Sequence, residues 1–203
     1  KVLDKYVKAI GGRSVVQKQK VRFSVGTLEL SPMNLKGTFE SYAAAEARSY
    51  SKMSITGIGD MIETTDGKTA WSANPIQGNR ERSGAELVQT KLVADFYRDI
   101  RLKTLYPKME LKGVEKMGGK DAYVITAAAD GIQPETWYFD KESGLLVRSD
   151  MTLIAPEGSH PISVFYEDHR KVDGIMIPYR VRTQLSDHDE LHGSQTRRGG
   201  RRR

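Results

Sequence analysis

Two consecutive β-hairpins in the second half of the sequence constrain the fold more than any other feature. The first joins residues 137–140 to 145–148 through the turn Lys141-Glu142-Ser143-Gly144, and the second joins 166–172 to 175–178 through Asp173-Gly174. A two-residue Asp-Gly connection favours a hairpin because both positions tolerate a positive φ, and the resulting twist matches the flanking strands. The second half is therefore predicted to be an antiparallel meander. Such a meander, with no catalytic cluster, is more typical of a container or a binding surface than of an enzyme.

The length and composition predict one soluble globular domain. The chain has 203 residues, of which 38% are hydrophobic and 29% charged, and it contains no apolar run of the roughly 18 residues needed to span a bilayer. It starts at Lys1 without an initiator Met or a charged-then-apolar leader, so we expect a processed mature form with a removed signal peptide, or a trimmed form. Because cysteine is absent, disulfides, thiolate chemistry and cysteine-based metal sites are excluded.

The positive charge is concentrated at the C-terminus. The net charge is +6, and five arginines lie in a Gly/Arg-rich stretch near the end, so subtracting them leaves +1 for the rest of the chain. The part of the chain before the C-terminal Gly/Arg-rich stretch is therefore not a basic nucleic-acid-binding domain. We expect residues 187–203 to form a polar, disordered tail. Binding of RNA or an anionic lipid surface by this tail is the less favoured alternative, since it lacks interleaved aromatic residues.

Three helical segments are predicted. Leu3, Tyr6, Val7 and Ile10 form one apolar stripe on a helix that Gly11-Gly12 ends, and a short helical turn at 14–18 is expected to follow. Ser83 with Glu86 three residues later matches a capping box, which predicts a central helix over about 84–99.

About eleven strands are predicted. Val21, Phe23 and Val25 alternate on one face, whereas Leu28 and Leu30 have the opposite parity, so we expect a bulge near Gly26-Thr27 to return the apolar side chains to one face. The other segments with strand character lie at about 35–43, 47–56, 58–65, 68–73, 109–117, 120–128, 134–140, 145–154, 161–171 and 175–186, and 74–82 is predicted to be a polar loop. The fold class predicted is mainly β (α+β), a strongly curved antiparallel sheet over residues 1–186.

No motif predicts catalysis, a metal or a cofactor. His188 and His192 have the spacing of a helical metal-binding pair, but the His-Glu-x-x-His pattern is absent and the surrounding residues are typical of a solvated loop. His169 is expected on a strand surface and His160 in a turn. No serine lies in a nucleophile elbow, and Gly57-Ile58-Gly59-Asp60 lacks the features of a phosphate loop. A metal-dependent hydrolase using His188 and His192 is thus only a third alternative.

Aromatic and Met residues are spread over many of the predicted strands. Most must form the core, but a curved sheet has one concave face that two helices can cover only in part. An incompletely covered concave face forms a hydrophobic pocket, and adaptable Met side chains suit a variable apolar ligand. The candidate residues for lining such a cavity are Phe23, Phe39, Met53, Met61, Trp71, Leu92, Phe96, Trp137 and Phe139.

A set of motifs resembles bacterial outer-membrane lipoprotein-sorting-like proteins, which are related to the LolA/LolB lipoprotein carriers. The motifs are Leu3-Asp4-Lys5-Tyr6-x-x-Ala9-Ile10-Gly11-Gly12, Asp66-Gly67-x-x-x-Trp71, Pro75-x-x-Gly78-x-Arg80-x-x-x-Gly84-x-Glu86-Leu87, Tyr138-Phe139-Asp140-x-x-Ser143-Gly144-Leu145-Leu146-Val147-Arg148 and Tyr166-x-Asp168-x-Arg170-x-Val172-Asp173-Gly174-Ile175-x-Ile177-Pro178. The resemblance covers about residues 3–181. It implies an incomplete β-barrel whose helices lid an apolar cavity, which in the carriers shelters lipoprotein acyl chains in the periplasm. The resemblance does not assign any functional residue of the carriers to a position in this sequence.

The sequence thus predicts a non-catalytic, monomeric protein of the periplasm or cell envelope. Its predicted partners are lipid or lipoprotein acyl chains and, as a further option, an envelope protein, with no specific nucleic acid, no transmembrane segment and no cofactor. The alternative is a structural or interaction module with a fully packed core, which docks to another protein by its sheet edge.

Overall fold

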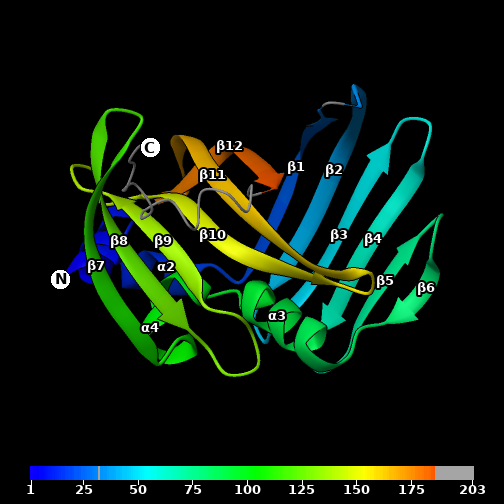
Figure 1. Ribbon diagram of the computed structural model, residues 1–203, viewed down its shortest axis with the longest axis horizontal. Helices are drawn as coiled ribbons and strands as arrows, with labels where there is room; N and C mark the ends of the chain where they lie inside the picture. The colour runs from blue at the N-terminus through cyan, green and yellow to red at the C-terminus, as the bar shows by residue number, and fades with distance from the viewer. Residues whose placement is uncertain (32, 186–203) are drawn as a thin grey trace, which may run out of the picture.

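The protein consists of two antiparallel sheets and four helices in this computed structural model, which describes residues 1–31 and 33–185 (Figure 1). The elements follow in the order α1 (Val2–Ala9), α2 (Arg13–Lys18), β1 (Val21–Leu30), β2 (Leu35–Ala44), β3 (Arg48–Ile55), β4 (Gly59–Asp66), β5 (Ala70–Asn74), β6 (Gly78–Glu81), α3 (Gly84–Ala94), α4 (Arg98–Leu105), β7 (Lys108–Met117), β8 (Lys120–Ala128), β9 (Glu135–Asp140), β10 (Leu146–Ala155), β11 (Gly158–Val172) and β12 (Ile175–Leu185). The predicted tail at 187–203 lies outside the described residues.

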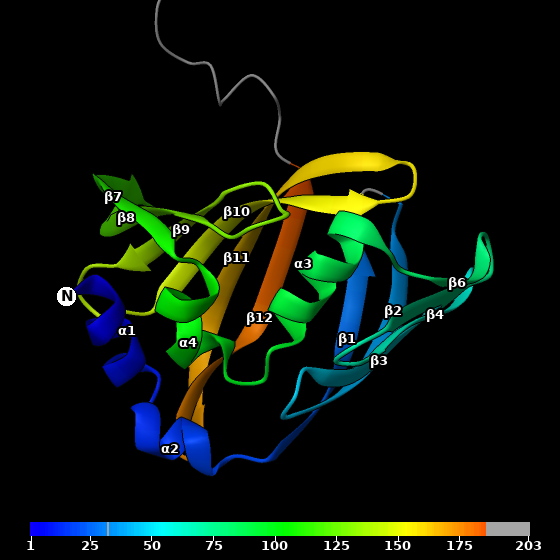
Figure 2. The same ribbon diagram turned by 90° about the horizontal axis from the view of Figure 1, so that it is seen from below.

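Each sheet is a six-stranded meander. The N-terminal sheet has the order β1 to β6, and the C-terminal sheet has the order β12-β11-β10-β9-β8-β7. The edge strands β1 and β12 are not joined by a ladder within the described residues, so the two sheets form an open, incomplete barrel rather than a closed one. Helix α3 lies between the sheets, and α1, α2 and α4 cover the C-terminal sheet (Figure 2). The predicted fold class is confirmed, and the described residues form twelve strands in place of about eleven.

The two hairpins that dominate the sequence form as predicted, and their turns show why. In the first, the Asp140 carboxylate accepts hydrogen bonds from the backbone N–H of Ser143 (2.6 Å) and from its hydroxyl (2.7 Å), and Gly144 follows with φ +79°. In the second, Asp173 and Gly174 have φ values of +48° and +85°. Both turns therefore use the backbone conformations that short hairpins between twisted strands require.

The main hydrophobic core lies between the C-terminal sheet and the helices. Its buried members come from α1, α2, α4 and the C-terminal strands, and they are Leu3, Tyr6, Ile10, Val16, Ile100, Leu102, Tyr106, Ile125, Ala127, Ala129, Trp137, Phe139 and Ile175. The apolar stripe predicted on the first helix points into this cluster through Leu3, Tyr6 and Ile10. The short helix expected at 14–18 is also confirmed, and its Val16 joins the same core.

The bulge predicted near Gly26 is wrong. Pairing of β1 with β2 continues in one register from Val21↔Ala44 to Leu30↔Leu35. A Cβ atom on Gly26 would lie 2.4 Å from Cε1 of Phe39, so glycine stands here because the Phe39 ring occupies the space above it. The apolar residues of β1 consequently remain split between the two faces of the sheet, with Val21 and Val25 exposed.

The central helix differs from the prediction at both ends. Ser83 occupies the N-cap position of α3, but its side chain makes no capping hydrogen bond, so the predicted capping box is wrong. The helix ends at Ala94 rather than near 99, because the Asp95 carboxylate accepts a hydrogen bond from the backbone N–H of Tyr97 (3.0 Å) and α4 begins at Arg98. The segment predicted to be a polar loop contains β6, which pairs with β5. No helix in the described part of the chain is long and apolar enough to cross a membrane.

Candidate functional site

The inner face of the N-terminal sheet, which we define as the face that carries α3, presents one apolar row. Strand registers place Phe39, Met53 and Met61 directly opposite one another on β2, β3 and β4. Met61 lies two residues before Glu63, whose side chain reaches the α3 region, so alternation puts the whole row on the inner face. We call Phe39, Met53 and Met61 the inner apolar row.

The inner apolar row is not part of a packed core. Among the described residues, neither of the two buried hydrophobic clusters includes a side chain from the N-terminal sheet. Phe39 and Met61 are half-buried, and Met53 is 37% exposed. The concave side of the protein thus carries apolar surface that the helices leave partly uncovered.

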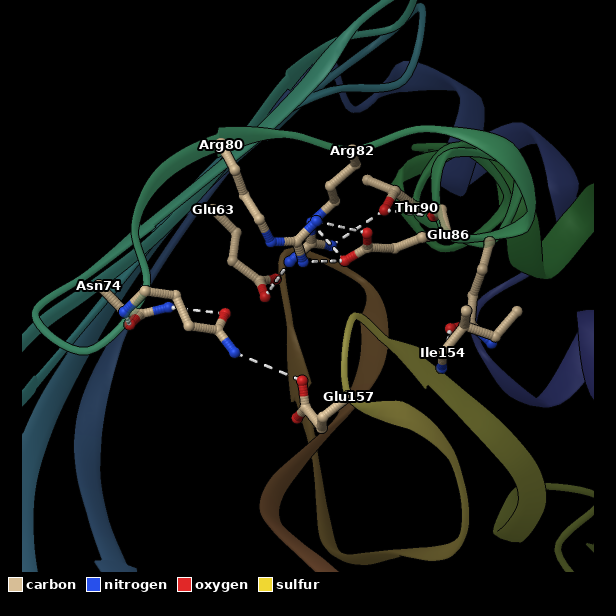
Figure 3. A network of polar contacts seen from close by, with 10 residues as sticks. Glu63, Asn74, Arg80, Arg82, Glu86, Thr90, Ile154 and Glu157 are labelled. Carbon is tan, nitrogen blue, oxygen red and sulfur yellow. Dashed lines mark hydrogen bonds and ion pairs between the residues drawn. The ribbon is translucent and has the colours of Figure 1, made fainter.

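An ion-pair cluster fixes α3 to the N-terminal sheet. Arg80 on β6 donates two hydrogen bonds to the Glu86 carboxylate of α3, at 2.7 Å from Nη1 to Oε2 and 2.5 Å from Nη2 to Oε1 (Figure 3). Both side chains are largely withdrawn from solvent. This bidentate geometry is the strongest form of an arginine–carboxylate contact.

Arg82 extends the cluster. Its guanidinium pairs with Glu63 of β4, donates a hydrogen bond to the Thr90 hydroxyl (2.9 Å), and lies 3.4 Å from the Glu86 carboxylate. Two arginines therefore face two glutamates, and the charges balance. We call Glu63, Arg80, Arg82, Glu86 and Thr90 the α3 clamp.

Gln89 fixes the other side of α3 to the C-terminal sheet. Its amide N–H donates to the Thr152 carbonyl (2.7 Å), and its amide oxygen accepts from the Ile154 N–H (3.0 Å). Strand β9 pairs with β10 only as far as Asp150, so the buried Gln89 side chain satisfies part of the β10 edge beyond it. Helix α3 is thereby held to both sheets at once (Figure 3).

Two of the residues predicted to line the cavity lie on the outer face of the N-terminal sheet. Phe23 is 54% exposed, and its ring lies 4.6 Å from that of Tyr42, which in turn lies 6.2 Å from that of Tyr50. Trp71 is also exposed and follows in the same cross-strand row, opposite Thr64. The strand register therefore separates Phe23 and Trp71 from the inner apolar row.

The remaining four predicted residues lie in or beside the main core. Trp137 and Phe139 are almost completely buried there, and Leu92 packs against it. Phe96, between α3 and α4, is buried in edge-to-face contact with Tyr97. Of the nine predicted residues, the structure brings together Phe39, Met53 and Met61.

A buried charge network supports the core beneath the helices. The carboxylate of Glu135, which is 2% exposed, accepts hydrogen bonds from Arg98 (3.0 Å), the Tyr106 hydroxyl (2.7 Å) and the Trp137 indole N–H (2.8 Å). Burial raises the pKa of Tyr106 to about 12. Burial opposes the charge on Arg98, but Tyr106 and Glu135 outweigh it and raise the pKa of the guanidinium. Tyr106 therefore stays neutral and Arg98 stays charged at physiological pH, which suits a structural role.

A separate pocket of about 190 Å³ lies where the helices meet β1, β11 and β12. We call it the helix–sheet pocket. Its lining is mostly apolar with a few polar side chains, and consists of Tyr6, Ile10, Val16, Arg22, Arg98, Asp99, Leu145, Leu146, Tyr166, His169, Ile175, Met176, Ile177 and Pro178. It shares no residue with the inner apolar row. Pockets for drug-sized ligands usually enclose about 300–1,000 Å³, so this one suits a small ligand or part of a larger one.

The four histidines, for which the sequence favours no catalytic or metal-binding role, are placed as follows. His169 lies on β11, half-buried in the wall of the helix–sheet pocket, and His160 lies in the same strand rather than in a turn. His188 and His192 lie outside the described residues. Within residues 1–31 and 33–185, no group of three His, Asp or Glu side chains is placed to hold a metal ion.

Sequence reasoning missed the residues that position α3. Arg80, Arg82 and Glu86 lie within seven residues of one another, whereas the capping-box pattern predicts a different contact for Glu86. The spacing Arg-x-Arg-x-x-x-Glu could have indicated an ion pair, since Arg82 and Glu86 are four residues apart. The contributions of Glu63 and of the β10 edge were not visible, because they come from distant parts of the chain.

Solved structures show the same fold. A DUF1329 family protein from Desulfovibrio piger aligns with a TM-score of 0.57 and 15% identity, over 91% of this chain and 85% of that one. The LolA superfamily protein NE2245 from Nitrosomonas europaea aligns with a TM-score of 0.53 and 12% identity, over 86% of each chain. A domain named for outer membrane lipoprotein sorting, from Vibrio parahaemolyticus, aligns with a TM-score of 0.52 and 9% identity, over 92% and 87%.

The resemblance noted in the sequence is therefore confirmed at the level of fold. The chain has the open-barrel architecture of LolA superfamily and lipoprotein-sorting-like proteins. No family model and no curated protein sequence matches the chain.

Proposed function

We propose that this protein is a non-catalytic carrier of the bacterial cell envelope that binds the acyl chain of a lipid or lipoprotein on the inner apolar row. The observation that carries the proposal is the position of Phe39, Met53 and Met61. They form a contiguous apolar row on the concave side, outside the packed core and beside a helix that is held by polar contacts.

The fold supports this proposal. Two of the aligned proteins are named for the LolA superfamily and for outer membrane lipoprotein sorting. A carrier or sorting role in the periplasm would be in keeping with those names, and we expect the protein to act as a monomer.

The energetics of acyl burial favour such a ligand. Each buried methylene contributes roughly 0.8 kcal/mol, so a few methylenes packed against the row would give measurable affinity. The flexible, polarizable side chains of Met53 and Met61 adapt to chains of different length and saturation. Affinity would therefore depend on the apolar length of the ligand more than on the details of its structure.

Helix α3 would act as the lid. Ion pairs and hydrogen bonds tie it to the N-terminal sheet and Gln89 ties it to β10, while its Leu92 packs against the main core. Polar contacts of this kind exchange readily for water once opened, whereas an apolar interface does not. Loading and release would need the α3 clamp to open or a partner to compete for the inner face.

The test is native mass spectrometry of the purified protein, with lipid analysis of a solvent extract, before and after incubation with phospholipid and with a diacylated lipopeptide. We expect a near-stoichiometric adduct. The variant Met53→Asp should lose it, and Tyr42→Asp, which places the same charge on the outer face, should keep it. A protein that stays free of lipid under all conditions would overturn the proposal.

One observation favours a second function. The exposed outer-face aromatic residues Phe23, Tyr42 and Trp71 provide a surface on which an envelope protein could dock, which fits an interaction module better than a carrier. If no lipid binds, this alternative becomes the better explanation of the fold.

A further inference from the structure

We propose that the helix–sheet pocket binds a small monocarboxylate with an apolar body, and that the guanidinium of Arg22 holds its carboxylate group. This inference does not rest on the acyl-carrier function. The pocket and the inner apolar row share no residue, and the pocket has its own chemistry.

The size of the pocket selects a short ligand. An engineered apolar cavity of about 150 Å³ in another protein holds one benzene molecule. The helix–sheet pocket, at about 190 Å³, is slightly larger. It accordingly fits a body of about six to eight carbon atoms, and a long acyl chain would leave most of its length outside.

The walls of the pocket suit an apolar body. Ile10, which directly follows α1, and Val16 of α2 line it on the helical side. Leu146 lies at the start of β10, and Ile175 and Ile177 line it from β12. Five branched aliphatic side chains from the end of α1 and from α2, β10 and β12 thus surround the space, which makes the transfer of hydrocarbon from water into it favourable.

Most of the polar groups in the pocket are already satisfied. The Tyr6 hydroxyl donates to the Asp99 carboxylate at 2.8 Å, and the Tyr166 hydroxyl lies 3.0 Å from the Ser149 hydroxyl. The charge of Arg98 is balanced by Glu135 and its Nη2 also donates to the Tyr106 hydroxyl, although its buried Nε has no hydrogen-bond partner among the described residues. These groups shape the pocket. Because each of them already has a protein partner, a charged group of a ligand would bind to another residue.

Arg22 is the exception. Its guanidinium carbon lies 5.3 Å from the centre of the Phe96 ring, and within the described part of the chain no carboxylate lies within 4.0 Å of its nitrogens. Arg22 lines the pocket and is also exposed, so it stands where the pocket opens to solvent. A guanidinium held against an aromatic face keeps its planar edge free for bidentate binding of a carboxylate.

The charges around the pocket favour a ligand that carries one negative charge. Asp99 lies in the same pocket wall, and its charge would repel a dianion such as phosphate more strongly than a monocarboxylate. A ligand with its carboxylate at the mouth and its apolar body inside satisfies both the arginine and the aliphatic walls.

The test uses octanoate and 1-octanol, which share an apolar body and differ in charge. Binding to the full chain is measured by calorimetry and by NMR shift changes at Ile10, Leu146, His169 and Ile177. We expect saturable 1:1 binding of octanoate with shifts at these positions. Arg22→Gln should weaken octanoate at least tenfold and leave octanol unchanged, Arg22→Lys should retain part of the affinity, and Arg48→Gln, a surface arginine of β3, should have no effect.

Three results would overturn the proposal: no saturable octanoate binding to the wild-type protein, equal affinity in Arg22→Gln and Arg48→Gln, or shifts confined to Phe39, Met53 and Met61. The variant Met53→Asp separates this site from the carrier function. It should lose long-chain lipid and still bind octanoate, and loss of both ligands would count against a separate pocket site.

Discussion

The Arg80 guanidinium holds the Glu86 carboxylate through two parallel hydrogen bonds, of 2.7 and 2.5 Å, that join the last strand of the N-terminal sheet to α3. The same carboxylate lies 3.4 Å from Arg82, so one glutamate contacts both arginines near the start of the helix. This contact attaches the first turn of α3 to the N-terminal sheet.

Replacing Glu86 with Gln should loosen α3. The two arginines would lose the central carboxylate in a site largely withdrawn from water, and we expect the free energy of unfolding to fall by about 1–3 kcal/mol. Hydrogen exchange should rise across α3 more than across β8. The control is Glu110→Gln, which removes an exposed partner of Lys112. Equal exchange in α3 for both variants would show that the α3 clamp does not hold the helix.

Replacing Gln89 with Ala should free the other side of α3. It removes two hydrogen bonds to the β10 backbone and leaves the carbonyl of Thr152 and the N–H of Ile154 without their partners, a loss of about 1–3 kcal/mol. Hydrogen exchange at Ile154 reports this directly. Gln77→Ala, at an exposed loop position, serves as the control. An unchanged exchange rate at Ile154 would contradict the role given to Gln89.

Adding a methyl group at Gly26 should displace the Phe39 ring, and the same change at Gly37 should be more damaging. A Cβ on Gly26 would meet the far end of a side chain that can rotate, whereas a Cβ on Gly37 would lie 2.1 Å from the backbone oxygen of Ser54. We therefore expect Gly26→Ala to lower stability by about 1 kcal/mol or less while altering lipid binding, and Gly37→Ala to cost about 1–3 kcal/mol. Urea denaturation of the two variants makes the comparison, and equal losses would contradict it.

Removing the buried carboxylate of Glu135 should be among the most destabilising single changes. The variant Glu135→Gln leaves the Arg98 charge without its partner in the core, and breaking a buried pair typically costs about 3–5 kcal/mol. The double variant Arg98→Met/Glu135→Leu removes both charges and should recover much of the loss. Urea denaturation measures all three proteins. If the double variant is less stable than Glu135→Gln, the network contributes more than charge compensation.

Stability should fall as the pH drops through about 6.5, and His169 should account for part of the slope. Burial lowers the pKa of His169 from 6.5, outweighing a hydrogen bond that the imidazole donates to the Leu146 backbone carbonyl, so the unfolded chain binds the proton more readily. The contribution is fully present above pH 6.5 and is lost below it. Carboxylates such as Asp140 and Asp168, whose pKa values are lowered from 3.8, act only in more acidic solution.

The variant His169→Gln should therefore flatten the dependence of unfolding free energy on pH between 7 and 5, as measured by urea denaturation. The variant His160→Gln removes another histidine from β11 and serves as the comparison. If both variants keep the wild-type slope, the acid sensitivity lies elsewhere.

Local features of the fold were predictable because they depend on neighbouring residues. The Asp140–Gly144 and Asp173-Gly174 turns, the apolar stripe of α1 and the short helix after Gly12 all follow from spacing and backbone preference. The errors occurred where a contact with a side chain of another strand competed with a local rule. Gly26 accommodates the Phe39 ring instead of a bulge, and Glu86 binds Arg80 instead of capping its own helix.

The sequence by itself determined that the chain forms successive antiparallel hairpins and which residues alternate on each strand. Only the tertiary structure decided which of the two faces turns inward. Phe23 and Phe39 lie on adjacent strands and are equally apolar, yet the register places one on the outer face and the other on the inner face. Strand alternation defines two faces without distinguishing them, and the distinction arises when α3 packs on one of them through residues distant in the chain.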